Sequence, residues 1–206
     1  MPRLIEQQNE DGGQGGNRNS PSSKDGKLVP ALTHAELCER GRRWLTGTAR
    51  CPIALIEFVA LLPEIPDAIG FRESGRDSVL IECKTSRSDF LRDAKKRHRQ
   101  EGASALGSYR YYLSPPGVIR IEDLPDKWGL LHVKARGVEL IAGADPKRTY
   151  WPPETDVWRW EVGFGEKVLM FSALQRVKVS VGNSTFRDMV QQTYSSMQKV
   201  KGTDHG

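Results

Sequence analysis

The sequence predicts an α/β protein of a single domain, in which helices flank a mixed central sheet. Its 206 residues are 37% hydrophobic, which is enough apolar surface for one compact core and too little for two. Short apolar runs of strand length are interleaved with segments of helical periodicity, an order typical of a sheet covered by helices. We expect a disordered polar tail over 1–30 and one domain over 31–206, with its core in 37–133 and a C-terminal extension over 143–206.

The first elements follow the polar tail. Residues 7–27 are rich in Gly, Asn, Ser, Gln and Asp and nearly lack apolar side chains, so they cannot offset the entropy lost on ordering. Thr33, with Glu36 three residues later, has the pattern of a helix N-cap, and apolar residues recur at helical spacing as far as Thr46. An apolar run over 52–62 comes next.

Two hairpins and two helices are expected after that run. Apolar runs over 65–71 and 78–83 flank a polar, glycine-containing turn and predict the first hairpin. Ser86 or Ser88 could cap a charged helix that reaches about Glu101. A strand is predicted over 109–114, and the second hairpin is predicted from strands over 129–133 and 138–141. A loop over 145–153 and a C-terminal helix over 186–200 complete the prediction.

The composition favours a soluble, cytoplasmic protein. Cys38, Cys51 and Cys83 form no CxxC pair, so neither a disulfide framework nor a zinc site is indicated, and a reducing compartment is expected. No apolar run has the length of a membrane span and no signal-peptide pattern opens the chain, so we expect no membrane partner. The net charge of +5 suits a polyanion such as nucleic acid. Neither a hydrolytic triad nor a histidine metal site is indicated by the scattered histidines, which are His34, His98, His132 and His205.

The residues that could carry chemistry lie on the first hairpin. If Ser74 and Gly75 form its turn, the numbers of facing residues sum to 149, and this register pairs Asp67 with Glu82. Directly opposed residues of an antiparallel pair have Cβ atoms roughly 5 Å apart on one face. Lys84, two residues beyond Glu82, points to that same face. The hairpin therefore presents two carboxylates and an ammonium together, unless a bulge shifts the register.

Two carboxylates at such a short separation repel one another unless a cation lies between them. Hard oxygen ligands suit Mg²⁺ or Mn²⁺, and Mg²⁺ keeps several waters and takes substrate phosphate oxygens. Such an ion polarises a phosphate and lowers the pKa of a bound water, while a nearby ammonium can orient that water. The expected cofactor is Mg²⁺ or Mn²⁺.

These residues resemble a known family. The segment 65–67, Ile-Pro-Asp, and the segment 81–84, Ile-Glu-Cys-Lys at the end of an apolar strand, resemble the PD-(D/E)xK phosphodiesterase superfamily. The continuation over 85–90 is similar to small DNA-repair members of the MmcB-like type, and the likeness extends over about Leu37 to Val133. The resemblance implies a restriction-endonuclease-like fold and a Mg²⁺-dependent endodeoxyribonuclease, acting in DNA repair, recombination or a phage or mobile-element context.

The same resemblance assigns roles to individual residues. The implied metal ligands are two carboxylates and one main-chain carbonyl, those of Asp67, Glu82 and Cys83. Lys84 is the implied catalytic lysine, beside the catalytic carboxylates. The superfamily also uses an upstream acid, for which Glu57 is better placed than Glu64.

Nucleic-acid binding, with DNA as the expected partner, is predicted for the helix after Lys84. Its basic residues could contact backbone phosphates and give salt-dependent, sequence-independent affinity; they are Arg87, Arg92, Lys95, Lys96, Arg97 and Arg99. The same run could be an ordinary solvated helix face. The tyrosines of the next strand, and Trp128, could stack on unpaired bases or pack in the core.

Three functions follow from these observations. The leading hypothesis is a Mg²⁺-dependent DNA nuclease, for which a homodimer would allow both strands of a duplex to be cut. The alternative is a catalytically inactive protein of nuclease fold that binds nucleic acid or a repair partner, and metal binding separates the two. A third is a small structural protein of a mobile element. The choice between DNA and RNA, the strandedness and the sequence specificity stay open.

Overall fold

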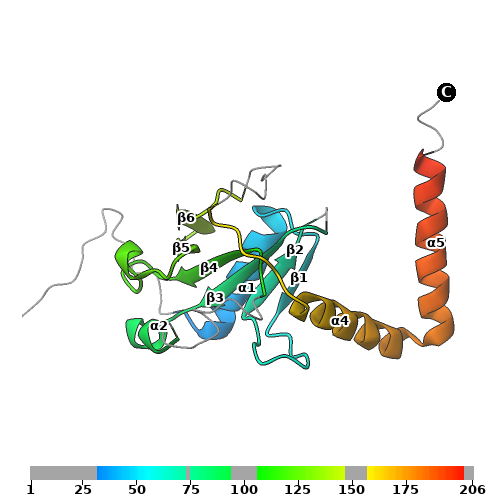
Figure 1. Ribbon diagram of the computed structural model, residues 1–206, viewed down its shortest axis with the longest axis horizontal. Helices are drawn as coiled ribbons and strands as arrows, with labels where there is room; N and C mark the ends of the chain where they lie inside the picture. The colour runs from blue at the N-terminus through cyan, green and yellow to red at the C-terminus, as the bar shows by residue number, and fades with distance from the viewer. Residues whose placement is uncertain (1–31, 73–74, 94–105, 147–156, 202–206) are drawn as a thin grey trace, which may run out of the picture. The chain divides into compact units, whose positions relative to one another are not determined.

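Figure 1 shows the computed structural model of the chain. It describes residues 32–72, 75–93, 106–146 and 157–201, with side chains as far as residue 192, so the predicted tail over 1–30 lies outside the described residues. Six strands form one mixed sheet accompanied by helices, which confirms the predicted α/β fold class. Among the described residues, no helix combines the length and apolar character needed to cross a lipid bilayer.

The strands lie in the sheet in the order in which they follow one another along the chain. The elements are α1 (His34–Gly47), β1 (Ile53–Ile56), β2 (Ala68–Phe71), β3 (Ser78–Cys83), α2 (Arg87–Asp93), β4 (Tyr109–Ser114), η1 (Ile121–Asp123), β5 (Trp128–Val133), β6 (Val138–Ala142), α4 (Gly165–Val181) and α5 (Asn183–Lys201). β3, β4 and β5 run parallel, and the other neighbouring strands are antiparallel. Both predicted hairpins are present, as β2–β3 and β5–β6.

α1 begins at a capping box, as the sequence predicts. The Thr33 hydroxyl accepts a hydrogen bond from the Glu36 amide at 3.3 Å, and the Glu36 carboxylate accepts one from the Thr33 amide at 2.8 Å. This reciprocal pair satisfies amides that the first helical turn leaves without helical partners. The buried side of α1 forms a core with alternate residues of β3; this core includes Leu37, Cys38, Leu45, Val79, Ile81 and Cys83.

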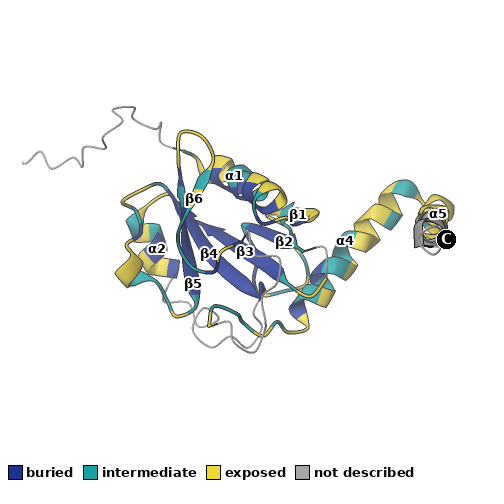
Figure 2. Cartoon of the chain, turned by 90° about the horizontal axis from the view of Figure 1, so that it is seen from above, coloured by how far each residue is buried: buried dark blue, intermediate teal, exposed yellow. Residues whose placement is uncertain are grey.

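The opposite face of the sheet carries a second core. Phe90 of α2 meets Tyr112 of β4 edge to face, with ring centroids 5.0 Å apart, and Tyr112 stacks on Trp128 at 4.4 Å. Leu80 of β3 and Leu169 of α4 belong to the same core. Figure 2 shows β3 and β4 buried along their whole lengths, as strands between two cores must be.

The aromatic side chains of β4 and β5 belong to these cores. Tyr109, Tyr111, Tyr112 and Trp128 are each at most 1% exposed. The suggestion that they stack on unpaired bases is therefore wrong, and the alternative interpretation as core residues is confirmed.

The apolar run over 52–62 forms a strand only in its first part. β1 ends at Ile56, and Glu57 adopts a left-handed backbone with φ of 44°. Its amide donates a hydrogen bond to the Asp67 carbonyl at 3.1 Å. The chain then leaves the sheet, and Phe58 and Leu62 pack partly buried against the second core.

The sequence interpretation did not predict α4. Apolar residues lie on all sides of this helix, so no periodic stripe marks it. Glu166 in its first turn accepts hydrogen bonds from the Gly107 amide at 2.9 Å and from the Ser78 hydroxyl, which joins the helix to β3 and to the segment just before β4. α5 begins at Asn183, earlier than the predicted start at Phe186.

Candidate functional site

The hairpin of β2 and β3 has the register that the sequence predicts. Ala68 faces Ile81, and every pair along the two strands has residue numbers that sum to 149. Asp67 comes immediately before β2, so the next position of this register places it opposite Glu82. The two carboxylate residues of the proposed motif are thus brought to the same end of the hairpin.

Glu82 and Lys84 lie side by side on the face that carries the second core. Glu82 is 3% exposed and Lys84 is 5% exposed, and the Lys84 ammonium lies 3.6 Å from Glu82 Oε2. The Lys84 amide donates a hydrogen bond to the Leu113 carbonyl at 2.9 Å, which extends the pairing of β3 with β4 by one residue. Lys84 is therefore fixed through both its main chain and its side chain.

Asp93 of α2 completes this group, and the sequence interpretation missed it. Asp93 Oδ2 lies 3.6 Å from Lys84 Nζ and accepts a hydrogen bond from the Tyr112 hydroxyl at 3.3 Å. The signal that could have found Asp93 is its position three residues after Phe90. Residues three apart share a helix face, and Phe90 packs on Tyr112, so Asp93 also faces the sheet. We call Glu82, Lys84 and Asp93 the lysine cluster.

The Asp67 carboxylate is held by groups from two other elements. Its Oδ2 accepts a hydrogen bond from the Cys83 amide at 2.7 Å, and its Oδ1 lies 3.3 Å from His34 Nε2 at the start of α1. Glu57 Oε1 lies 4.0 Å from the same imidazole nitrogen. The main chain of Glu57, the better placed of the two upstream acids considered, also contacts Asp67, since the Glu57 amide donates a hydrogen bond to the Asp67 carbonyl, and the other acid, Glu64, is buried.

A further group of possible metal ligands surrounds Asp67. Among the described side chains, one set of three His, Cys, Asp or Glu residues has all its ligand atoms within 4.8 Å of one another, namely His34, Cys38 and Asp67. Glu82 is not in this set. Sequence reasoning missed this set of three residues. The sequence shows that His34 and Cys38 share one helix face, but it does not show that α1 packs close to Asp67, because that is a tertiary contact.

The Cys83 thiol lies in the core on the α1 side of the sheet. A hydrogen bond with Cys38, together with burial and the nearby carboxylates of Asp67 and Glu82, raises the pKa of Cys83 well above its ordinary value. The thiol therefore stays protonated at neutral pH. Its main-chain carbonyl is the group left to act as the ligand that the family resemblance implies.

The predicted phosphate contacts are only partly within the described residues. Those outside them are Lys95, Lys96, Arg97 and Arg99. Arg87 makes two hydrogen bonds to the Asp123 carboxylate, at 2.8 and 3.1 Å, and Arg120 binds the same group. The hydrogen bonds from Arg120 and Arg87 lower the pKa of Asp123. Arg92 is 78% exposed in its side chain and lies 3.4 Å from Asp89.

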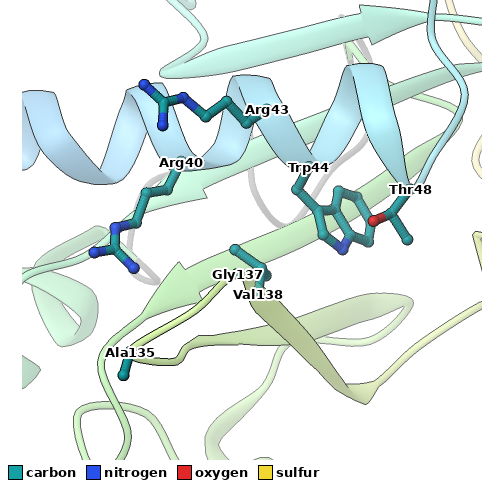
Figure 3. A pocket seen from close by; sticks show the side chains of 7 residues that line it. All are labelled: Arg40, Arg43, Trp44, Thr48, Ala135, Gly137 and Val138. Carbon is teal, nitrogen blue, oxygen red and sulfur yellow. The ribbon is translucent and has the colours of Figure 1, made fainter.

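A hollow of about 330 Å³ lies between α1 and the turn that joins β5 to β6 (Figure 3). It is lined by Arg40, Arg43, Trp44, Thr48, Ala135, Gly137 and Val138. Arg40 donates a hydrogen bond to the Lys134 carbonyl at 2.8 Å. Arg43 donates one to Glu39, whose pKa is lowered to about 2 by hydrogen bonds from Arg42 and then Arg43. The hollow contains none of the predicted site residues, and its cationic groups already bind acceptors of this chain.

No family model and no curated protein sequence matches this chain. Among solved structures, the chain is similar to the SPO1766 protein of unknown function from Silicibacter pomeroyi. The two have 22% sequence identity and a TM-score of 0.48, and the match covers 74% of this chain and 94% of that one.

Proposed function

We propose that this chain is a metal-dependent nuclease of the PD-(D/E)xK type that hydrolyses phosphodiester bonds of DNA. The observation that carries the proposal is the end of β3, where Glu82 and Lys84 lie 3.6 Å apart on one face and Asp67 takes the facing position. An ordinary surface ion pair does not explain this arrangement, because both residues are at most 5% exposed. Burying such charges costs several kcal/mol per ion, roughly, so a function that needs them accounts for their presence.

The donor groups at this strand end fit a hard divalent cation. The carboxylates of Asp67 and Glu82 and the carbonyl of Cys83 are oxygen ligands of the kind that Mg²⁺ and Mn²⁺ prefer. Glu57 supplies a further acid beside Asp67. When bound, such an ion polarises a phosphate group and promotes the ionisation of water.

The residues of the chain itself supply position and charge. The Cys83 amide holds the Asp67 carboxylate against β3 at 2.7 Å. Lys84 places an ammonium beside Glu82, where it can stabilise the negative charge that develops on a phosphate during attack. Asp93 acts as a positioning residue, because it contacts the Lys84 ammonium and is itself held by Tyr112.

One observation favours a second function, that of an inactive protein of nuclease fold that binds nucleic acid or a repair partner. Among the described side chains, the set whose ligand atoms are close enough to share a metal ion is His34, Cys38 and Asp67, and it does not include Glu82. The Lys84 ammonium also contacts two carboxylates at 3.6 Å. On this reading the acidic residues are structural, and the protein takes up no Mg²⁺ at Glu82.

Cleavage of labelled single-stranded, duplex and branched DNA tests the proposal. Each substrate is incubated with Mg²⁺, Mn²⁺ or EDTA and with wild type, Glu82→Gln or Glu139→Gln. Glu139 is the matched control, since it is an exposed carboxylate that pairs with Lys134 on the β5–β6 hairpin. We expect metal-dependent cutting by wild type and by Glu139→Gln, and loss of cutting by Glu82→Gln.

The other outcomes are equally informative. Equal cutting by Glu82→Gln and wild type would contradict the assignment of Glu82 as a metal ligand. Absence of cutting on every substrate, with DNA binding retained and no Mg²⁺ uptake by calorimetry, would favour the inactive binding protein. Cutting of a labelled RNA assayed alongside, with no DNA substrate cut, would correct the substrate. Sedimentation of the protein on duplex DNA would test the expected homodimer.

A further inference from the structure

His34, Cys38 and Asp67 bring three different ligand types to one point. His34 and Cys38 are four residues apart on α1, so they lie on the same helix face, and Asp67 precedes β2. Their ligand atoms all lie within 4.8 Å of one another, and His34 Nε2 is 3.3 Å from Asp67 Oδ1.

The fold fixes each of the three from a different side. The capping box at Thr33 sets the first residue of α1, which is His34. Cys38 is fully buried in the first core, so its thiol has little freedom to turn away. The Cys83 amide holds Asp67 Oδ2, which leaves Oδ1 facing His34. These contacts hold the three ligand groups close together.

The donor set selects a class of metal. A thiolate, an imidazole nitrogen and a carboxylate oxygen are the usual ligands of Zn²⁺ and its first-row neighbours, whereas Mg²⁺ takes oxygen ligands. Bonds of about 2.1 Å in a tetrahedral site place nitrogen and oxygen ligands about 3.4 Å apart. The distance of 3.3 Å from His34 Nε2 to Asp67 Oδ1 is close to that spacing.

The exposure of the three residues leaves one side open. Cys38 is fully buried, while the side chains of Asp67 and His34 are 18% and 44% exposed. Glu57 Oε1, at 4.0 Å from His34 Nε2, is near enough to become a fourth ligand, and water could take that position instead. Glu57 reaches this place through its left-handed backbone, a conformation that carries strain of about 1 kcal/mol or more and gathers at functional sites.

We propose that His34, Cys38 and Asp67 bind one transition-metal ion of the zinc class. An ion pair between His34 and Asp67 alone would not require a buried thiol within 4.8 Å of both ligand atoms. The proposal does not depend on nuclease activity, because metal uptake is measured directly.

Titration of the reduced, metal-free full chain with Co²⁺, followed by displacement with Zn²⁺, tests it. Co²⁺ bound to a thiolate gives a near-ultraviolet charge-transfer band, and a tetrahedral site gives strong visible bands. We expect one equivalent of Co²⁺ with both features in wild type. Cys38→Ser should lose the charge-transfer band and bind at least about tenfold more weakly, as should His34→Gln. Cys51→Ser is the matched control, since Cys51 is another fully buried cysteine but is not one of the three proposed ligands. This variant should bind Co²⁺ as wild type does.

Two results would overturn the proposal. One is a wild-type protein that takes up no Co²⁺ or binds it without a thiolate band. The other is a band that persists in Cys38→Ser and disappears in Cys83→Ser, since Cys83 contacts Cys38. Circular dichroism reports whether each variant is folded. His34→Gln keeps the test decisive if Cys38→Ser does not fold, because His34 is partly exposed and lies at the helix end.

Discussion

Replacing Lys84 by methionine should destabilise the fold, because it removes the cation that Glu82 and Asp93 share. Both carboxylates lie 3.6 Å from the ammonium, and the three residues are between 2% and 5% exposed. Methionine fills a similar volume, so the change isolates the charge from the packing of the side chain.

The structure sets the size of the effect. One unit pair at 3.6 Å attracts by about 4–5 kcal/mol at an effective dielectric constant near 20, and desolvation of the charges offsets part of this. Removal of one partner from a buried ion pair lowers stability by about 3–5 kcal/mol. We therefore expect Lys84→Met to lose about 3–5 kcal/mol of unfolding free energy at neutral pH. Lowering the pH should restore part of it, because a proton on either carboxyl group removes their mutual repulsion.

Urea denaturation followed by circular dichroism measures this loss. Lys134→Met is the matched control: Lys134 Nζ lies only 2.6 Å from Glu139 Oε2, but both side chains are 50% exposed. Solvent screens that pair, so its loss should change the unfolding free energy by about 0–1 kcal/mol. If Lys84→Met fell within the same range of about 1 kcal/mol, the view that buried charge holds α2 to β3 would be refuted.

The stability of the lysine cluster bears on the cleavage assay as well. A domain has only about 5–15 kcal/mol of stability, so Lys84→Met could lose activity by unfolding. Glu82→Gln keeps the shape of the side chain and is the better probe of a ligand role. A loss of cutting by Lys84→Met indicates a catalytic role for Lys84 only under conditions in which the unfolding curve shows that the variant is folded.

Three further results are expected. Thr33→Ala should lower the unfolding free energy by about 1 kcal/mol in urea denaturation, because it removes the N-cap of α1. Glu166→Ala should lower it by about 1–3 kcal/mol, because it removes the oxygen that accepts the Gly107 amide and the Ser78 hydroxyl, and hydrogen exchange should show faster opening of α4. Hydrogen bonds from Arg120 and Arg87 lower the pKa of Asp123 in the folded protein. The ionised Asp123 therefore contributes its full stabilisation above the unfolded-state pKa of about 3.9, and this contribution is lost as the pH falls below that value. Asp123→Asn should accordingly flatten the acid side of a stability curve measured from pH 2 to pH 6, roughly, and an unchanged curve would contradict the assignment.

Local signals account for the parts of the fold that the sequence predicts. The capping box at Thr33, the alternation on β3 and the turn before Ser78 act over a few residues, and each determines its own element. α4 has no such signal, because its apolar residues surround the helix and its first turn is fixed by contacts with Gly107 and Ser78, which lie far away in sequence. The early end of β1 depends in the same way on the contact of Glu57 with Asp67.

The candidate site divides along the same line. The facing of Asp67 and Glu82 follows from the hairpin register, which the short connection between β2 and β3 determines. The positions of Asp93 and His34 follow from how α2 and α1 pack on the sheet, and hydrophobic periodicity cannot show which polar residue a packed helix brings to a strand end. The sequence interpretation therefore described one side of the site, formed by the hairpin, and missed the groups that the helices contribute.

Asp67 is the residue that both proposals require, and its two carboxylate oxygens have different neighbours. Oδ2 accepts the Cys83 amide, whereas Oδ1 faces His34. A cation bound with His34 and Cys38 would therefore engage Oδ1 and leave the carboxylate in place against β3. Once its charge is neutralised there, Asp67 attracts a second cation beside Glu82 less strongly. A metal of the zinc class and a hard ion such as Mg²⁺ would then compete for Asp67, and for Glu57 as well if Glu57 joins either ion.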